Sequence, residues 1–290
     1  MPAYYEEGFK KQFEAAIPDL IILLLIIGVI ALNPSLVRGI PVLGDLFGGS
    51  AVDVLVIGDS ATEANAWRTH LSGNLALQVF GSPLNVEAIT DADYNKVSSA
   101  DWLNSRGYDV IVLTATDMTP ELQLITREWV TGGGKLLVIG KGGTQANGRW
   151  AELSSIVPVS CPQGDCSGVF EQVYAPTLYI SEGEFGNGLA KNVNTATPMT
   201  AADASINVAN VPVTGTRILY IGGFPTAAEV KAGSTGNIYP AVAEKMDVTG
   251  GKVLWMSFNP TTENIDTDVE TSMVVNAFAY LIGSAGYQSA

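Results

Sequence analysis

Side chains that could carry nucleophilic or metal chemistry are scarce in this chain of 290 residues. It has one histidine, His70, and two cysteines, Cys161 and Cys166. A zinc site of the histidine–cysteine type takes three or four such ligands, so we expect no metal. A cysteine nucleophile needs a base within hydrogen-bond reach, and no histidine follows residue 70. We therefore expect neither a thiol-based catalytic pair nor a bound cofactor.

The two cysteines lie in the stretch "SCPQGDCSG", with Pro162 and Gly164 between them. This spacing suits a tight hairpin that a disulfide closes, and loop entropy would make the bond worth roughly 2 kcal/mol. The alternative is two free thiols; the spacing is not that of a redox CxxC motif. We expect the Cys161–Cys166 disulfide, and a disulfide indicates an oxidising compartment.

A second candidate site is the glycine-rich turn in "KLLVIGKGGTQ", residues 135–145. A buried strand is expected to end at Gly140, in the place where many α/β enzymes carry a nucleophile, but the turn holds only glycine and lysine. Such a turn could present backbone N–H groups and a lysine ammonium to an anion. Open α/β sheets bind ligands beyond the carboxyl ends of their strands. The ligand-binding residues predicted there are Asp59, Ser60, Asp117, Lys141 and Gly142.

The elements that would position these residues alternate between strand and helix. Buried apolar runs predict strands, and capped amphipathic stretches predict helices. In chain order we expect strand 52–58, helix 60–73, strand 85–90, helix 98–106, strand 108–116, helix 119–134 and strand 135–139. This alternation predicts a flavodoxin-like α/β fold, with a mostly parallel sheet and helices on both faces.

The alternation stops after residue 144. Residues 145–215 are rich in Thr, Asn, Val and Gly, and they predict a β-rich insertion of short strands and loops. A buried strand over 217–223, a hairpin over 241–258 and a final helix over 268–283 follow. Acidic residues at 266, 268 and 270 lack the glycine-containing loop of a calcium site, so they fit a solvated helix start better.

The N-terminal region carries an apolar stretch, "IPDLIILLLIIGVIALNPSLV", over residues 17–37. About 20 such residues span the hydrocarbon core of a bilayer as a helix. A cleaved signal peptide is the alternative, but no small-x-small cleavage site follows cleanly. The predicted organisation is a tail (1–16), a transmembrane helix (17–37), a juxtamembrane linker (38–50), an α/β domain (51–284) and a C-terminal tail (285–290).

Charge bears on orientation and on partners. Lys10 and Lys11 precede the apolar stretch and Arg38 follows it, a bias that favours a cytoplasmic N-terminus and an extracytoplasmic domain. The whole chain has 15 basic and 29 acidic residues, a net charge of −14. Nucleic acid needs a basic surface, so we expect no nucleic-acid partner. The bilayer itself is the predicted partner of residues 17–37.

Three stretches, in this order, resemble the class I glutamine amidotransferase-like domain: "AITDADYN", "YDVIVLTATDMTPELQLITREWVTGGGKLLVIG" and "GGKVLWMSFNPTTENIDTDVETSMVVNAFAYLIG". The resemblance covers roughly residues 52–144 and 216–284. It is closest to the non-catalytic branches found in membrane-anchored and gliding-motility or intraflagellar-transport-type proteins. In active members a cysteine stands on the turn after the strand equivalent to 135–139, and a histidine and an acidic residue follow. This chain lacks those residues, which implies that amidotransferase activity is absent.

The stretch "VLVIGDSATE" is similar to the first block of the GDSL/SGNH hydrolases, with Ser60 as the candidate nucleophile. The histidine that this family carries near its C-terminus has no counterpart here. His70 lies about ten residues along the helix that Ser60 starts, roughly 15 Å along its axis. With Glu63 three residues on, Ser60 fits the capping residue of that helix better.

Together these features predict a single-pass protein of the cell membrane with a catalytically silent, amidotransferase-like extracytoplasmic domain. We expect it to act as a binding or assembly subunit of a membrane or cell-surface complex. Its expected partners are other membrane or surface proteins, and a homo-oligomer is an open alternative. Two other functions stay open: a small-molecule or glycan-binding module, and a serine hydrolase that uses Ser60.

Overall fold

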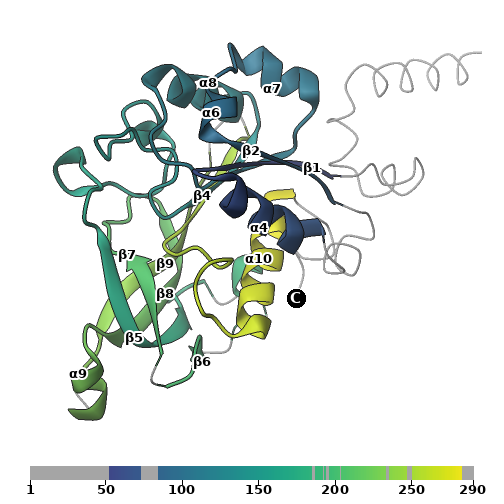
Figure 1. Cartoon of the computed structure of the whole chain (residues 1–290). Helices are drawn as coiled ribbons and strands as arrows, with labels where there is room; N and C mark the ends of the chain where they lie inside the picture. Colours follow the sequence, from purple (N-terminus) through teal and green to yellow (C-terminus); the bar gives the residue numbers. More distant parts are fainter. Residues whose placement is uncertain are drawn as a thin grey trace, which may run out of the picture. The chain divides into compact units, whose positions relative to one another are not determined.

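The computed structural model describes residues 52–72, 84–184, 187–191, 193, 196–202, 204–232, 235–246 and 250–282 (Figure 1). They belong to a compact unit that spans Ala51–Ala290. The predicted tail 1–16, membrane segment 17–37, linker 38–50 and tail 285–290 lie outside the described residues. Within the described ranges, no helix combines the length and the apolar character needed to cross a membrane.

Half of the sheet is parallel and follows the flavodoxin-like strand order. The strand order here is β2-β1-β3-β4-β10, and every neighbouring pair is parallel. This is the 2-1-3-4-5 order of flavodoxin-like sheets, as the alternating pattern predicted. The strands are β1 (Val52–Gly58), β2 (Leu84–Thr90), β3 (Val110–Leu113), β4 (Lys135–Ile139) and β10 (Lys252–Met256).

The other half of the sheet is antiparallel, so the prediction of a mostly parallel sheet holds for only part of it. The predicted hairpin corresponds to β9 and β10, and the sheet continues beyond β9 in the order β9-β8-β5-β6, with β7 also paired to β5. Of these strands, β5, β6 and β7 belong to the insertion. The insertion is β-rich as expected, but β5 is eleven residues long rather than short. These strands are β5 (Phe170–Ile180), β6 (Thr197–Pro198), β7 (Ser205–Ala209), β8 (Thr216–Phe224) and β9 (Asn237–Met246).

Helices cover both faces of the parallel half, as predicted. Alternate residues of each strand point to opposite faces, so Val54 and Val56 pack with α4 and α10, whereas Leu55 and Ile57 pack with α6, α7 and α8. The short helices α6 and α9 were not predicted from the sequence. The helices are α4 (Ala61–Ser72), α6 (Asp91–Tyr94), α7 (Ala100–Arg106), α8 (Pro120–Thr131), α9 (Ala227–Ala232) and α10 (Thr267–Ile282), with 3-10 turns at Leu153–Ser155, Pro162–Gly164 and Gly188–Ala190.

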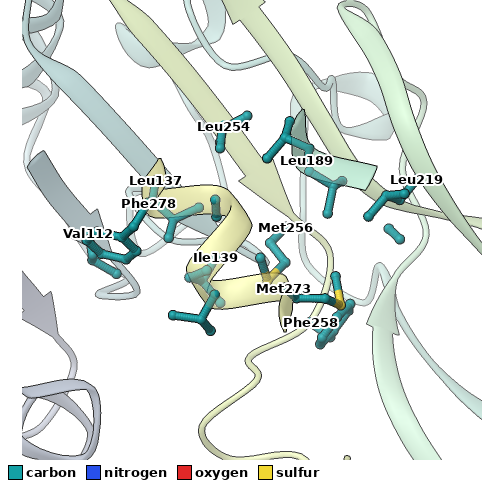
Figure 2. Close-up of a cluster of buried hydrophobic side chains, with 14 of the residues drawn as sticks. Val112, Leu137, Ile139, Leu189, Leu219, Leu254, Met256, Phe258, Met273 and Phe278 are labelled. Carbon is teal, nitrogen blue, oxygen red and sulfur yellow. The ribbon is translucent and has the colours of Figure 1, made fainter. Parts of the chain in front are cut away.

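The C-terminal helix α10 packs on the buried hydrophobic cluster that contains Val54 and Val56 (Figure 2). Met273 and Phe278, on its inner side, are 3% and 1% exposed and belong to the same buried cluster as Leu137, Ile139 and Met256 of the sheet. Full burial of each such side chain stabilises the fold by roughly 1.5–3 kcal/mol. This packing fixes the carboxyl ends of β4 and β10, where the candidate site lies.

Candidate functional site

The predicted site residues do meet at one edge of the sheet, where β1, β3, β4 and β10 end. In this strand order the crossover direction reverses between β1 and β3, and ligands of flavodoxin-like sheets bind at that point. Asp59 and Ser60 follow β1, Asp117 follows β3, and Lys141 and Gly142 follow β4. The structure therefore brings the five residues to one edge, and their individual contacts decide what each can do.

Asp59 is bonded to the neighbouring loop. Its carboxylate accepts a hydrogen bond from the backbone N–H of Thr116 at 2.5 Å, and the Thr116 hydroxyl lies 3.0 and 3.1 Å from the two carboxylate oxygens. These bonds join the loop after β1 to the loop after β3. Hydrogen bonds to a carboxylate are stronger than neutral ones, so Asp59 holds the two loops together across the switch point.

Glu63 extends this network to a third loop. One of its carboxylate oxygens accepts from the backbone N–H of Asp59 at 3.2 Å, and the other accepts from the side-chain amide of Asn259 at 3.1 Å. The predicted capping box thus forms with its return bond on Asp59 rather than on Ser60. Sequence reasoning missed Asn259, which follows β10, because no local pattern links it to a residue so far away in the chain.

Ser60 caps helix α4. Its hydroxyl oxygen accepts from the backbone N–H of Glu63 at 3.2 Å. The imidazole that could serve it as a base points elsewhere, since Nδ1 of His70 lies 3.2 Å from a carboxylate oxygen of Glu270 on α10. A serine nucleophile needs a base within hydrogen-bond reach, so the contacts made by Ser60 fit a helix cap.

The glycine turn after β4 uses its backbone donors internally. Four N–H groups that could have cradled an anion already donate to carbonyl oxygens, so they are not available to a ligand. The pairs are Gly140 to Met256 at 2.7 Å, Gly142 to Ile139 at 2.8 Å, Gly143 to Ala115 at 2.6 Å and Thr144 to Lys141 at 3.1 Å.

The carbonyl groups of the same turn are also bonded. Trp255 donates its indole N–H to the carbonyl of Gly140 at 2.6 Å, Trp150 donates to Gly142 at 2.8 Å, and Gln123 donates to Gly143 at 2.7 Å. All three side chains are buried. No local sequence pattern gives the two tryptophans this role, and their contacts in the structure show that they hold the turn in place.

Phe170, the first residue of the insertion strand β5, covers the turn. A Cβ atom on Gly140 would lie 2.7 Å from the tip of the Phe170 ring, and Gly140 itself has a φ of 57°. Both the backbone conformation and the close ring favour glycine at this position. The insertion thus places an aromatic ring against the glycine turn that follows β4.

The side chains of two predicted residues are accessible to solvent at this edge. Asp117 is exposed and has a φ of 66°, a conformation that is uncommon outside glycine. Lys141 is partly exposed. A backbone bond from Met118 to Thr144 at 2.8 Å brings their loops together. Among the residues that the structure describes, neither side chain has a hydrogen-bond or ion-pair partner, so these two remain the candidates for contact with a ligand.

The remaining candidate chemistry is structural. Cys161 and Cys166 lie at disulfide distance, with Cα atoms 5.0 Å apart, and Cys166 donates its N–H to Gly148 at 2.8 Å. Asp266 caps α10 by accepting from the N–H of Asp268 at 3.0 Å. Nowhere in the described ranges do three or more histidine, cysteine or acidic side chains gather in a way that could hold a metal ion.

Comparison with known proteins identifies the fold but no family. No protein-family model and no curated protein matches the chain. A cytoplasmic protein of Salmonella typhimurium LT2 (STM1381) aligns with a TM-score of 0.53 and 13% identity, covering 81% of this chain and 99% of that protein. A protein described as ThuA-like, from Parabacteroides merdae, gives 0.53 and 15% identity with 81% and 91% covered.

A second cytoplasmic protein of Salmonella typhimurium (STM3548) gives a TM-score of 0.51 at 15% identity, covering 78% of this chain and 98% of that protein. At identities this low the likeness shows the fold alone. The fold is consistent with the class I glutamine amidotransferase-like fold predicted from the sequence. The membrane-anchored type and the GDSL resemblance are not tested by it.

Proposed function

We propose that this protein is a catalytically silent, amidotransferase-like binding or assembly subunit, held at the cell membrane by residues 17–37. Its partners would be other membrane or surface proteins. The observation that carries the proposal is the closed glycine turn after β4. Phe170 lies on Gly140, and three buried side chains bond the carbonyl groups of the turn.

The state of the thiols and of the imidazole supports the proposal. A cysteine nucleophile must be a free thiolate, whereas Cys161 and Cys166 lie at disulfide distance from each other, and neither is a residue of the glycine turn. The one histidine of the chain, His70, is directed at Glu270. The two thiols and the imidazole, which could have formed a nucleophile–base pair, therefore make other contacts.

Two features support a location at the membrane with the domain outside the cytoplasm. Residues 17–37 match the length and apolar character of a membrane-spanning helix. The disulfide fits an oxidising compartment. A protein of this kind would present the carboxyl edge of its sheet, with Asp117 and Lys141, to partners on the cell surface.

A turnover assay tests the catalytic silence. The full-length chain in a mild detergent would be incubated with glutamine and with a panel of short-chain esters. We expect no release of ammonia or alcohol above the rate given by Ser60→Asp, because aspartate keeps the helix cap but cannot act as the serine nucleophile. Turnover that Ser60→Asp and Ser60→Ala both abolish would instead assign a serine hydrolase.

A further inference from the structure

The antiparallel half of the sheet carries a hollow that the proposed function does not use. It lies between β8, β9 and the loop that precedes β8, and its volume is about 430 Å³. Valine and proline make up most of the described residues that line it, and Arg217 is the only charged residue among them. The lining residues are Val211, Pro212, Val213, Gly215, Arg217 and Pro240.

The loop wall of this hollow is held in place by backbone bonds. Pro158 accepts from the N–H groups of Thr214 at 2.8 Å and Gly215 at 2.9 Å, and Pro212 accepts from Ser160 at 2.9 Å. The facing wall is the ladder of β8 and β9, in which Pro240 is paired with Tyr220. A wall fixed before binding lowers the ordering cost that a ligand must overcome.

Arg217 is oriented by an aromatic neighbour. The guanidinium carbon lies 5.4 Å from the centre of the Tyr220 ring, and that ring stacks on Tyr179 with centroids 5.1 Å apart. None of the described acidic side chains pairs with Arg217, although the chain has 29 acidic residues. A guanidinium presents a fork of N–H donors that matches a carboxylate.

We propose that this hollow binds a small amphipathic carboxylate. The carboxylate would accept the N–H groups of Arg217, and the apolar part would lie along Val211, Val213 and Pro240. The inference goes beyond the proposed function, because it depends neither on the membrane segment nor on the absence of catalysis. It also differs from the predicted ligand position at Asp117 and Lys141, which lies at the carboxyl edge of the parallel strands.

Three matched probes test the charge requirement: 4-phenylbutyrate, 4-phenylbutanol and 4-phenylbutylamine. Each would be titrated by calorimetry into the full-length chain in lipid nanodiscs, with empty nanodiscs as the blank. We expect the carboxylate to bind at least about tenfold more tightly than the alcohol, because its bonds to Arg217 are charge-assisted. The amine should bind most weakly of the three.

Substitutions then locate the site. Arg217→Gln should lower the affinity for 4-phenylbutyrate to that of the alcohol, and Val213→Trp, which fills the hollow, should weaken both. Arg106→Gln is the matched control, because Arg106 also lies over an aromatic ring, 5.0 Å from the centre of Trp102, but outside this hollow. Thermal melting would check that each variant is folded.

Three results would overturn the inference. The first is no measurable binding of 4-phenylbutyrate to the folded wild-type chain. The second is equal binding of the carboxylate and the alcohol, which would remove the role of Arg217 as an anion receptor. The third is unchanged carboxylate binding in folded Arg217→Gln, which would place the ligand elsewhere.

Discussion

At the residue scale, contacts within the protein explain why glycine stands at position 142 in the turn after β4. Gly142 was predicted to offer its backbone to an anion, but its N–H donates to Ile139 at 2.8 Å. A Cβ atom at this position would lie 2.1 Å from the carbonyl oxygen of Leu113. Glycine is therefore required by the close approach of β3, a contact that the sequence pattern of the turn does not reveal.

Gly142→Ala should lower the free energy of unfolding by about 2–3 kcal/mol, because overpacking against a fixed backbone carbonyl strains the turn. The measurement is chemical denaturation of the variant and of the parent chain. Gly132→Ala is the control, since its added carbon would lie 3.3 Å from the nearest atom. Equal small losses in both variants would contradict the close approach.

Tyr94 and Thr126 form a buried hydroxyl pair on the α8 face of the sheet. Their oxygens lie 2.8 Å apart, and Thr126 also donates to the carbonyl of Leu122 at 2.8 Å. The Tyr94 hydroxyl therefore donates to Thr126. Burial raises the pKa of Tyr94 to about 12, so its folded pKa exceeds the unfolded value of 10.0.

We expect Tyr94→Phe and Thr126→Val to be coupled by about 1 kcal/mol in a double-mutant cycle, since each removes one side of the same hydrogen bond. A raised folded pKa means that the contribution of Tyr94 is fully present below pH 10 and is lost as pH rises toward 12. The alkaline loss of stability should therefore be smaller in Tyr94→Phe. Strictly additive effects would contradict the pairing.

At the scale of elements, the sequence predicted the strands whose positions depend on local patterns of apolar residues. The buried apolar runs located β1, β2, β4 and β8 within one residue of their ends. Strand 108–116 was predicted too long, because the structure keeps only Val110–Leu113 in the ladder. The path of β5 to β7 could not be predicted, since pairing across long loops depends on partners that no local period specifies.

The end of α10 meets the sheet through a partly buried polar cluster. The Tyr280 hydroxyl donates to the carboxylate of Glu244 on β9, and the Lys252 ammonium donates to the carbonyl of Tyr280 at 3.1 Å. Burial raises the pKa of Glu244 above its ordinary value of 4.5, and burial lowers the pKa of Lys252. The cluster therefore makes the docking of α10 sensitive to pH.

The raised pKa of Glu244 in the folded state fixes the direction in which its contribution to stability changes with pH. Its contribution to stability is fully present below pH 4.5 and is lost as pH rises through the raised folded value. Glu244→Gln should therefore flatten the fall in unfolding free energy that begins near pH 4.5 in the parent chain. Glu128→Gln, on the exposed side of α8, removes a carboxylate as the control. The same slope in both variants would contradict the assignment.

At the scale of the whole molecule, the sequence predicted that the candidate residues lie together at one edge of the sheet. It did not predict the contacts that each of them makes there. It placed Asp59 and Ser60 after a strand, which follows from the buried run that precedes them. The roles of Phe170, Trp150 and Trp255 at the glycine turn could not be predicted, because they depend on tertiary contacts that no local pattern specifies. The backbone groups of the glycine turn are hydrogen-bonded within the protein, and this is why we propose assembly rather than catalysis.

The native mass of the protein tests the central proposal most directly. Membranes that contain the full-length chain would be extracted in a mild detergent or directly into nanodiscs, and the particle mass would be measured by mass photometry. We expect a particle that holds this chain together with further membrane or surface subunits at fixed stoichiometry. A homogeneous monomer that carries only lipid or detergent would contradict it.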